Sequence, residues 1–447
     1  MTTAADKTVY IKTFGCQMNE NDTQRMLALL APKGYLATSD PKSADLILIN
    51  SCSIREKSYQ KALSEIGRFK KHGKLDGLIG LTGCVASQEG EKLTKRFPFL
   101  NLVLGTDHLA KLPKLIDELK PQKSVVESKL VPLTDYRFAE LPPFHSFSSV
   151  KSSVTIMKGC DNACSFCIVP FVRGKEVSRS PDEILAEIRK MEGVRELLLL
   201  GQNVNSYGKR LSPKTTFAEL LRRIDEETGI LRLRYVSPHP KDLSDQLINE
   251  HVVNTKLCRH IHLPVQSGSS RVLKKMRRSY TREVYLRKVE KLRQKNPDMA
   301  ISTDIIVGFP GESLRDFAET LSLMKEVRFD ASYSFTYSPR PQTESSLFVD
   351  DVLPSVKEGR LKEVQALQAE IGLLRNQEKI GRVEEVLVEG ISETRGGKRQ
   401  LFGRTSGNQM VNFDGDEGQI GAILKVQIKQ ATPYVLKGRL PKGGIDA

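Results

Sequence analysis

Tryptophan is absent from the 447-residue sequence, aromatic residues make up only 6% of it, and no apolar run approaches the roughly 18 residues of a membrane-spanning helix. The sequence therefore predicts no membrane span. Acidic residues are scarce relative to basic ones, with 54 Asp and Glu against 69 Lys and Arg, so the formal net charge is +15. That charge favours an anionic partner, and nucleic acid leads membranes because we find no basic amphipathic terminal helix. Mere solubility is the alternative explanation of the charge.

Cysteine is also scarce. There are seven cysteines, an odd number, in a chain whose length suits two to four domains and whose composition is that of a soluble globular protein. Disulfides are rare in the cytoplasm, where we expect this chain to act, so metal binding explains the cysteines better than a disulfide framework does. Cys258 has no companion in the sequence, and we expect it to be structural.

Three of the cysteines lie within eight residues of one another. Cys160, Cys164 and Cys167 follow an apolar run at 154–157 that predicts a strand. Thiolates are soft ligands that suit iron–sulfur clusters or zinc. A structural zinc site would normally have four ligands, and no fourth Cys or His lies nearby in the sequence. Three ligands on a cubane would leave one iron open, so the spacing favours a redox enzyme, with zinc as the alternative.

Three more cysteines follow the ends of predicted strands near the amino terminus. Continuous apolar runs at 8–13, 45–50 and 78–81 alternate with helical patterns such as 22–30 and 58–69. This alternation predicts a parallel sheet covered on both faces, in which ligands bind outside the carboxyl ends of the strands. Cys16, Cys52 and Cys84 all fall there, so they can form a second site with three protein ligands. We expect a helix at 107–119 to close this domain, followed by a linker marked by Pro121, Pro132, Pro142 and Pro143.

The rest of the chain predicts an α/β class protein with two further domains. Six strand–helix units, with strands at 154–158, 196–200, 231–236, 260–265, 301–307 and 331–337, suit an open or partial β/α barrel. Ser180, Pro181 and Glu183 predict a capped helix start. Five short antiparallel strands after residue 382 predict a small OB-like barrel. We place the domains at 7–123, 146–376 and 379–442.

The cysteine motifs resemble those of a known family. The stretch Lys158–Cys167 is similar to the CxxxCxxC motif of radical S-adenosylmethionine (radical SAM) enzymes. The segments 14–19, 50–56 and 82–88 (FGCQMN, NSCSIRE, TGCVASQ) resemble the amino-terminal domain of the methylthiotransferase family, and segments 388–390, 403–405 and 411–413 resemble the RNA-binding TRAM domain. The resemblance covers nearly the whole chain.

The resemblance implies two 4Fe–4S clusters and S-adenosyl-L-methionine as cofactors. Cys160, Cys164 and Cys167 would hold the cluster whose open iron takes the methionyl group, and Cys16, Cys52 and Cys84 would hold an auxiliary cluster that delivers sulfur. The loops after the central strands also resemble the family's core, which implies cofactor contacts at Gln202, Asn203 and Glu312. No catalytic residue is implied beyond the cluster ligands.

The loops 15–19 and 201–208 look most like those of family members that act on tRNA carrying N6-isopentenyladenosine. The implied reaction is methylthiolation of C2 of that base, next to the anticodon, by a monomer that needs an electron donor and a sulfur source and no membrane. Two relatives offer alternatives, one acting on threonylcarbamoyl-adenosine in tRNA and the other on an aspartate of a ribosomal protein. A non-enzymatic RNA-binding iron–sulfur sensor is a rival of another class, although a sensor needs no open iron.

Two further features stay open at the level of sequence. The segment 271–295 contains eleven Lys and Arg residues and only two Glu. This excess of positive charge predicts either a solvated helix face or a phosphate-contact surface. His239 and His262 have no partnered Ser, Cys or carboxylate close in sequence, so we interpret them as core or loop histidines rather than acid–base catalysts.

Overall fold

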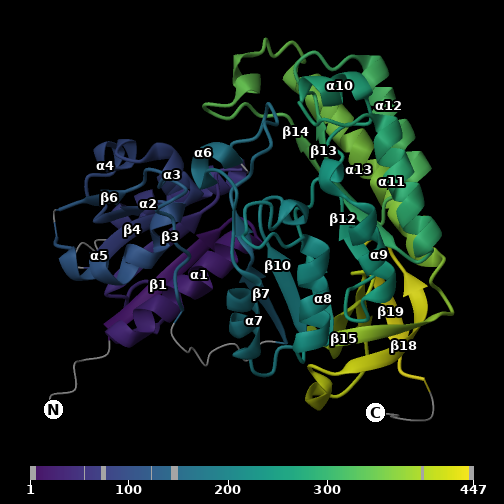
Figure 1. Cartoon of the computed structure of the whole chain (residues 1–447), viewed down its shortest axis with the longest axis horizontal. Coiled ribbons are helices and arrows are strands. Elements are labelled where there is room, and N and C mark those ends of the chain that lie inside the picture. The colour runs from purple at the N-terminus through teal and green to yellow at the C-terminus, as the bar shows by residue number, and fades with distance from the viewer. Residues whose placement is uncertain are drawn as a thin grey trace.

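The computed structural model describes residues 7–54, 56–71, 77–121, 123–141, 150–393 and 397–441, which form three packed units (Figure 1). The amino-terminal unit is a six-stranded, fully parallel sheet with the order β2-β1-β3-β4-β5-β6. Its strands are β1 (Lys7–Phe14), β2 (Tyr35–Ala37), β3 (Leu46–Ser51), β4 (Leu78–Gly83), β5 (Leu102–Leu104) and β6 (Val125–Glu127). Its helices are α1 (Gln17–Leu30), α2 (Glu56–Lys71), α3 (Cys84–Glu89), α4 (Lys92–Arg96) and α5 (Leu112–Glu118), with 3-10 turns at Ala31–Lys33 and Thr106–Lys111.

This sheet is buried on both faces, as the continuous apolar strands predict. Ile47 and Ile49 of β3 pack in one core cluster with the α2 residue Ile66. Leu46 and Leu48 of the same strand pack in the opposite cluster with residues of α1 and α5. The predicted parallel sheet is therefore confirmed.

The helix expected to close this domain differs from the one in the structure. The predicted helix at 107–119 is a 3-10 turn followed by the short α5, and the chain then adds β6 in parallel to β5. Strands of three residues such as β2, β5 and β6 carry too short an apolar run to be distinguished from loop in the sequence. Pro121 and Pro132 lie in turns, whereas Pro142, Pro143 and the boundary residues 146 and 442 lie outside the described residues.

The central unit is the expected partial barrel of six parallel strands. Its strands are β7 (Lys151–Thr155), β10 (Glu196–Leu200), β11 (Arg232–Tyr235), β12 (His260–His262), β13 (Ala300–Val307) and β14 (Ala331–Thr336). They form two three-stranded halves, β7-β10-β11 and β12-β13-β14, that meet at a single parallel bridge between Leu233 and Leu257. The helices are α6 (Val169–Arg173), α7 (Pro181–Arg189), α8 (Phe217–Glu227), α9 (Asp245–Val253), α10 (Ser270–Lys275), α11 (Arg282–Lys295), α12 (Leu314–Val327) and α13 (Pro354–Gln377), with 3-10 turns at Val204–Ser206, Pro240–Asp242 and Glu344–Leu347.

Two local predictions can be checked in this unit. The predicted strand at 154–158 is broken, because the chain leaves β7 after Thr155 and pairs β8 (Met157–Lys158) antiparallel with β9 (Val177–Ser178). The helix start at Ser180 is confirmed, since the Ser180 hydroxyl accepts from the Glu183 amide and the Glu183 carboxylate accepts from the Ser180 amide.

The carboxyl-terminal unit is a closed five-stranded barrel with the order β15-β16-β17-β19-β18. Its strands are β15 (Val383–Glu393), β16 (Arg399–Thr405), β17 (Met410–Phe413), β18 (Ile423–Ala431) and β19 (Val435–Arg439), with a 3-10 turn at Glu417–Gln419. The expectation of purely antiparallel strands was wrong, because β17 and β19 pair in parallel. The barrel is closed by β19, the last strand, which lies beside β17 and runs in the same direction.

Two buried arginines of β11 fasten this small barrel to the central unit. Arg232 donates to the carbonyl oxygens of Glu385 and Arg404 at 2.8 and 2.7 Å. Arg234 donates to the carbonyl oxygens of Thr405 and Ser406 and is paired with Glu196 at 2.9 Å.

In the described part of the chain, no helix is both long enough and apolar enough to cross a bilayer.

Candidate cluster sites

The amino-terminal sheet brings Cys16, Cys52 and Cys84 together. Cys16 occupies the N-cap position of α1 two residues after β1, Cys52 directly follows β3, and Cys84 begins α3 after β4. Because parallel strands end at one edge of the sheet, three residues that are far apart in sequence meet there. The thiols of Cys16 and Cys84 are close enough to Cys52 to be the main causes of its raised pKa.

Two of these three thiols ionise more easily than an ordinary cysteine. The contact with Cys52 lowers the pKa of Cys16 to about 6 and that of Cys84 to about 7, against the opposing effect of burial. The Arg173 guanidinium lowers both values further, while the pKa of Cys52 is raised by its two thiol neighbours and by burial. Thiolates are the form that binds metal, so the site is suited to ligation at neutral pH.

Gly83 allows the strands to deliver these thiols so close together. Its φ of +86° is costly for any residue with a side chain, and a Cβ atom there would lie 2.4 Å from Asn50 Oδ1. Asn50 is fixed in turn, because its amide group accepts from Asn19 Nδ2 at 3.0 Å and donates to the Asn19 carbonyl at 2.7 Å.

The second triplet lies on a loop at the carboxyl end of the first barrel strands. The Cys160 amide donates to the Gly174 carbonyl at 3.1 Å, and the Cys167 amide donates to that of Cys164 at 3.1 Å. Ser165, between the cysteines, donates from its amide to Met276 and from its hydroxyl to Lys275, both at the end of α10. The loop is therefore held from two sides of the barrel.

Positive and N–H groups converge on Cys164. Arg278 is buried and its Nη1 donates to Cys164 Sγ at 3.4 Å. Burial, followed by the charge of Cys164, raises the pKa of Cys167 to about 12, and burial also raises the pKa of Cys160. The cost of ionising these buried thiols is one that a bound cationic metal group would remove.

His239 is a buried loop residue, as interpreted from the sequence, but it also lies beside a cysteine. Its Nε2 is 3.9 Å from Cys164 Sγ, and burial lowers its pKa to about 2, so the ring is neutral. Nδ1 accepts from the Lys241 amide at 3.2 Å, which places the single ring proton on Nε2. His239 therefore faces the sulfur as a donor and is unsuited to be a fourth metal ligand.

For His262 the fold supplies partners that the sequence does not reveal. His262 Nε2 is 3.3 Å from Asp304 Oδ2, and Nδ1 is 3.0 Å from Ser302 Oγ. These partners lie on the neighbouring strand β13.

Cys258 is buried away from both triplets, and its backbone amide donates to the Leu233 carbonyl oxygen.

The three side chains expected to contact the cofactor are partly engaged within the protein. Gln202 Oε1 accepts from the Gly159 amide at 2.5 Å, directly before Cys160. Asn203 Nδ2 donates to Asp242, and its Oδ1 accepts from the His239 amide. Glu312 Oε2 accepts from the Gly308 amide and from Arg360, whereas its buried Oε1 has no hydrogen-bond partner in the described part of the chain. Their role as cofactor contacts stays a prediction.

Helix α6 joins the two triplets, a link that the sequence does not reveal. It begins two residues after Cys167, and Ile168 and Val172 pack on Cys84. Arg173, at its end, pairs with Asp22 of α1 at 2.8 Å, and the charges of Cys84, Asp22 and Cys16 raise its pKa against the effect of burial. The two cysteine sites are therefore neighbours that share one buried helix.

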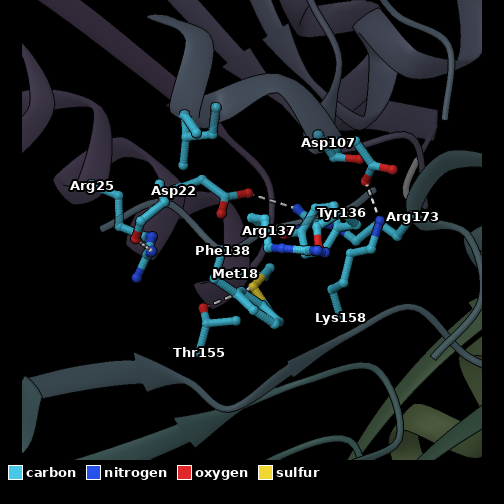
Figure 2. Close-up of a pocket in the computed structure, with 14 residues that line it drawn as sticks. Met18, Asp22, Arg25, Asp107, Tyr136, Arg137, Phe138, Thr155, Lys158 and Arg173 are labelled. Carbon is cyan, nitrogen blue, oxygen red and sulfur yellow. Dashed lines mark hydrogen bonds and ion pairs between the residues drawn. The ribbon is translucent and has the colours of Figure 1, made fainter. Parts of the chain in front are cut away.

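A charged pocket lies beside this helix, between the amino-terminal sheet and the barrel (Figure 2). Lys158 Nζ, two residues before Cys160, is 2.5 Å from Asp107 Oδ1, and both side chains are buried. The ring of Tyr136 lies 3.7 Å from the same Nζ. The segment that connects the two units thus contributes a wall of the pocket.

Most of the basic run between 271 and 295 is used within the fold. Its engaged members pair with carboxylates, donate to carbonyl oxygens or contact Cys164: Arg271, Arg277, Arg278, Arg282, Lys288, Lys291 and Arg293. Among the described residues, none of these partners is found for four members of the run: Lys274, Lys275, Arg287 and Lys295. The run is therefore largely structural, and phosphate contacts by this surface would depend on few side chains.

The donor sets fit iron–sulfur clusters better than a single ion. Each site offers three soft thiols. His239 is not available as a fourth ligand, because Nδ1 accepts a hydrogen bond and Nε2 carries the ring proton. N–H groups from Arg278 and His239 surround Cys164, as outer partners commonly do at metal ligands.

Three family models match the chain in the order of its structural units. The model described as Uncharacterized protein family UPF0004 matches residues 8–105, that of the Radical SAM superfamily matches residues 154–324, and that of the TRAM domain matches residues 377–440. Among solved structures, the apo form of the cobalamin-dependent S-adenosylmethionine radical enzyme OxsB has a TM-score of 0.50 at 14% identity, covering 81% of this chain and 56% of that chain. At this identity the likeness concerns the fold alone.

Curated relatives align with the chain over nearly its whole length. The tRNA-2-methylthio-N(6)-dimethylallyladenosine synthase of Geobacter sulfurreducens is 46% identical over 99% of this chain and 99% of its own length. Proteins of the same name from Syntrophus aciditrophicus and Clostridium botulinum are 46% and 44% identical, covering 97% and 96% of this chain and 94% and 96% of their own lengths. The chain therefore belongs to the tRNA-2-methylthio-N(6)-dimethylallyladenosine synthase family, within the radical SAM superfamily.

Proposed function

We propose that this chain methylthiolates C2 of N6-isopentenyladenosine next to the anticodon in tRNA, giving 2-methylthio-N6-isopentenyladenosine. The observation that carries the proposal is the near-complete alignment with relatives named for this product, at 44% to 46% identity. The adjacent cysteine triplets support it, because the reaction needs both a radical and a sulfur atom at one carbon. The chain is an enzyme that depends on S-adenosylmethionine and iron–sulfur chemistry.

The chemistry explains why a radical is needed. The C2–H of adenine is neither acidic enough for a general base nor electrophilic enough for a nucleophile at neutral pH. When bound, a 4Fe–4S cluster with an open iron supplies the electron that cleaves S-adenosylmethionine to a deoxyadenosyl radical. A second S-adenosylmethionine would supply the methyl group.

The residues of this chain would divide the work between two clusters. Cys160, Cys164 and Cys167 would hold the first, and Arg278 would stabilise the negative charge on Cys164 through the 3.4 Å contact. Cys16, Cys52 and Cys84 would hold the second, with Arg173 as its buried counter-charge. Gln202, Asn203 and Glu312 are proposed to contact the cofactor, and the unpartnered Oε1 of Glu312 supports its part in this.

The closed barrel at the carboxyl terminus would bind tRNA. Lys425 and Lys429 of β18 and Lys437 and Arg439 of β19 are exposed on adjacent strands, opposite the inward-facing Val426, Ile428 and Leu436. Phosphate contacts from such a face give affinity that falls with salt. We further propose a cytoplasmic monomer, with domains at 7–123, 146–376 and 379–442, that receives electrons and sulfur from other proteins or small molecules.

Nucleoside analysis tests the function directly. In cells that lack this protein, tRNA should contain isopentenyladenosine and no 2-methylthio-isopentenyladenosine, and the gene should restore the product. If the deletion leaves that product unchanged, the substrate assignment is wrong. Loss of the methylthio derivative of threonylcarbamoyl-adenosine, or of the modified aspartate of a ribosomal protein, would support one of the two alternatives instead.

A further inference from the structure

The half-barrel β12-β13-β14 has one apolar face and one polar, partly exposed face. Ile261, Ile301 and Ile305 are buried in a core that includes residues of the helices α11 and α12. Because successive strand residues point to opposite faces, the residues between them face the barrel interior. In Figure 1 the helices α11, α12 and α13 lie together along one side of these strands.

The interior face carries a group of polar and aromatic side chains in register. His262 aligns with Ser302, Asp304 aligns with Tyr333, and Ile306 aligns with Phe335. Tyr333 is 51% exposed and Phe335 is 37% exposed. Interior positions of β/α barrels are usually filled by packed branched side chains, so two accessible rings there leave room for a ligand.

A hydrogen-bonded chain fixes the polar groups beside these rings. Ser302 Oγ lies 3.0 Å from both His260 Nε2 and His262 Nδ1. His262 Nε2 in turn lies 3.3 Å from Asp304 Oδ2. Asp304 Oδ1 has no hydrogen bond within the described ranges, and the Asp304 side chain is 30% exposed. The His262 ring meets Tyr333 edge to face, with centroids 5.8 Å apart.

We propose that this face is the binding site of the target adenine and its N6 substituent. Tyr333 stacks on the base, the free oxygen of Asp304 accepts the N6–H, and Phe335 contacts the apolar isopentenyl group. This assignment rests on the proposed function, which it deepens by naming the residues that recognise the base. RNA-binding proteins read extruded bases in this way, with aromatic stacking and hydrogen bonds to base edges.

The position of the reacting atom agrees with this arrangement. In adenine the N6 group and C2 lie on either side of N1, so a base held by its N6 edge keeps C2 free. Asp304 would accept the one N6–H that the isopentenylated base retains, and Phe335 would distinguish this base from unmodified adenine through contact with the alkyl group. The hydrogen bond between His262 and Asp304 Oδ2 fixes the orientation of the carboxylate, so that Oδ1 is left to accept that proton donor.

Binding to a short RNA tests the assignment. The probe is an anticodon stem-loop with isopentenyladenosine at the target position, compared with the same RNA carrying adenosine or an abasic site. We expect the cluster-loaded protein to bind the isopentenyl form most tightly. Tyr333→Leu should weaken this binding by about tenfold, the scale of one lost base–aromatic stack, and should leave binding of the abasic RNA unchanged. Asp304→Asn should reduce the preference for isopentenyladenosine over the abasic form.

The controls separate the possible failures. Tyr434→Leu removes another exposed tyrosine, 73% accessible on the carboxyl-terminal barrel, and should keep the preference among the three RNAs. A wild-type protein without any preference would contradict the proposed function. If the wild type prefers the isopentenyl RNA and both Tyr333→Leu and Asp304→Asn keep that preference, the site assignment is wrong but the proposed function stands. The same holds if these variants lose as much affinity for the abasic RNA as for the isopentenyl RNA. Circular dichroism and iron content of each variant establish that it is folded and loaded.

Discussion

Replacing Asp107 with asparagine tests how the amino-terminal unit holds the cysteine loop of the barrel. Asp107 Oδ1 and Lys158 Nζ are 2.5 Å apart, and their side chains are only 1% and 6% exposed. Removing one partner of a buried ion pair leaves an uncompensated charge, which costs about 3–5 kcal/mol. We expect this destabilisation for Asp107→Asn and separately for Lys158→Met. The double variant should cost clearly less than the sum, because neither charge then remains buried alone.

The Asp107→Asn variant should also acquire a characteristic pH dependence. Burial lowers the pKa of Lys158 below its ordinary value of 10.5, and Asp107 opposes this shift. Without the carboxylate the folded-state pKa falls further, so between the folded and unfolded values the unfolded chain binds more protons. Stability therefore rises with pH up to the unfolded pKa and is lost as pH falls. The wild type should show a weaker slope of the same sign.

The assay is urea unfolding followed by circular dichroism with all thiols kept reduced, comparing midpoints at constant slope. The exposed pair of Lys33 and Asp117 is a matched control, because it has the same 2.5 Å separation with side chains 39% and 57% exposed. Asp117→Asn should cost less than about 1 kcal/mol. An Asp107→Asn variant no less stable than this control, or strict additivity in the double variant, would refute the reasoning.

Three further variants test other parts of the structure. Gly159→Ala should deplete iron from the barrel site only, because the added Cβ would lie 2.1 Å from the Lys175 carbonyl oxygen at a φ of +73°. The control Gly193→Ala should keep full iron content, because that glycine has a similar φ of +75° but no atom within 4 Å of the added Cβ. Lys425→Gln and Lys437→Gln should each reduce the slope of log affinity for tRNA against log salt by roughly 0.7–0.9, and an unchanged slope would remove this face from the interface. Cutting the chain after Glu378 should lower the thermal midpoint as well as tRNA affinity, since Arg232 and Arg234 lose their carbonyl partners; an equal midpoint would show that these contacts add no stability.

Sequence patterns predicted those features whose physical cause is local. Continuous apolar strands identify a buried parallel sheet, and the sheet alone explains why Cys16, Cys52 and Cys84 meet, since each follows a strand by one or two residues. The capping box at Ser180 is likewise a local hydrogen-bond pattern. The spacing of Cys160, Cys164 and Cys167 predicts a three-ligand site from local sequence alone, and that site stays a prediction.

Features that depend on strand register or domain packing were missed. His262 and Asp304 are far apart in the sequence, and only the register of β12 against β13 makes them partners. The link from Arg173 to Cys84 requires the packing of α6 on the amino-terminal sheet. Charge density alone could not show that Lys288 and Arg293 donate to carbonyl oxygens inside the fold.

Separate replacement of the two cysteine triplets tests the central claim most directly. Cys16, Cys52 and Cys84 replaced together by alanine should leave one cluster, because the other three cysteines lie on a single loop with its own contacts to α10. With S-adenosylmethionine, reductant and tRNA, this variant should still make 5′-deoxyadenosine and should make no methylthiolated adenosine. The reverse variant should retain one cluster and make no 5′-deoxyadenosine. Iron and sulfide analysis with product chromatography would show this pattern, whereas methylthiolated product from the first variant, without added sulfide, would contradict the assignment of the amino-terminal site.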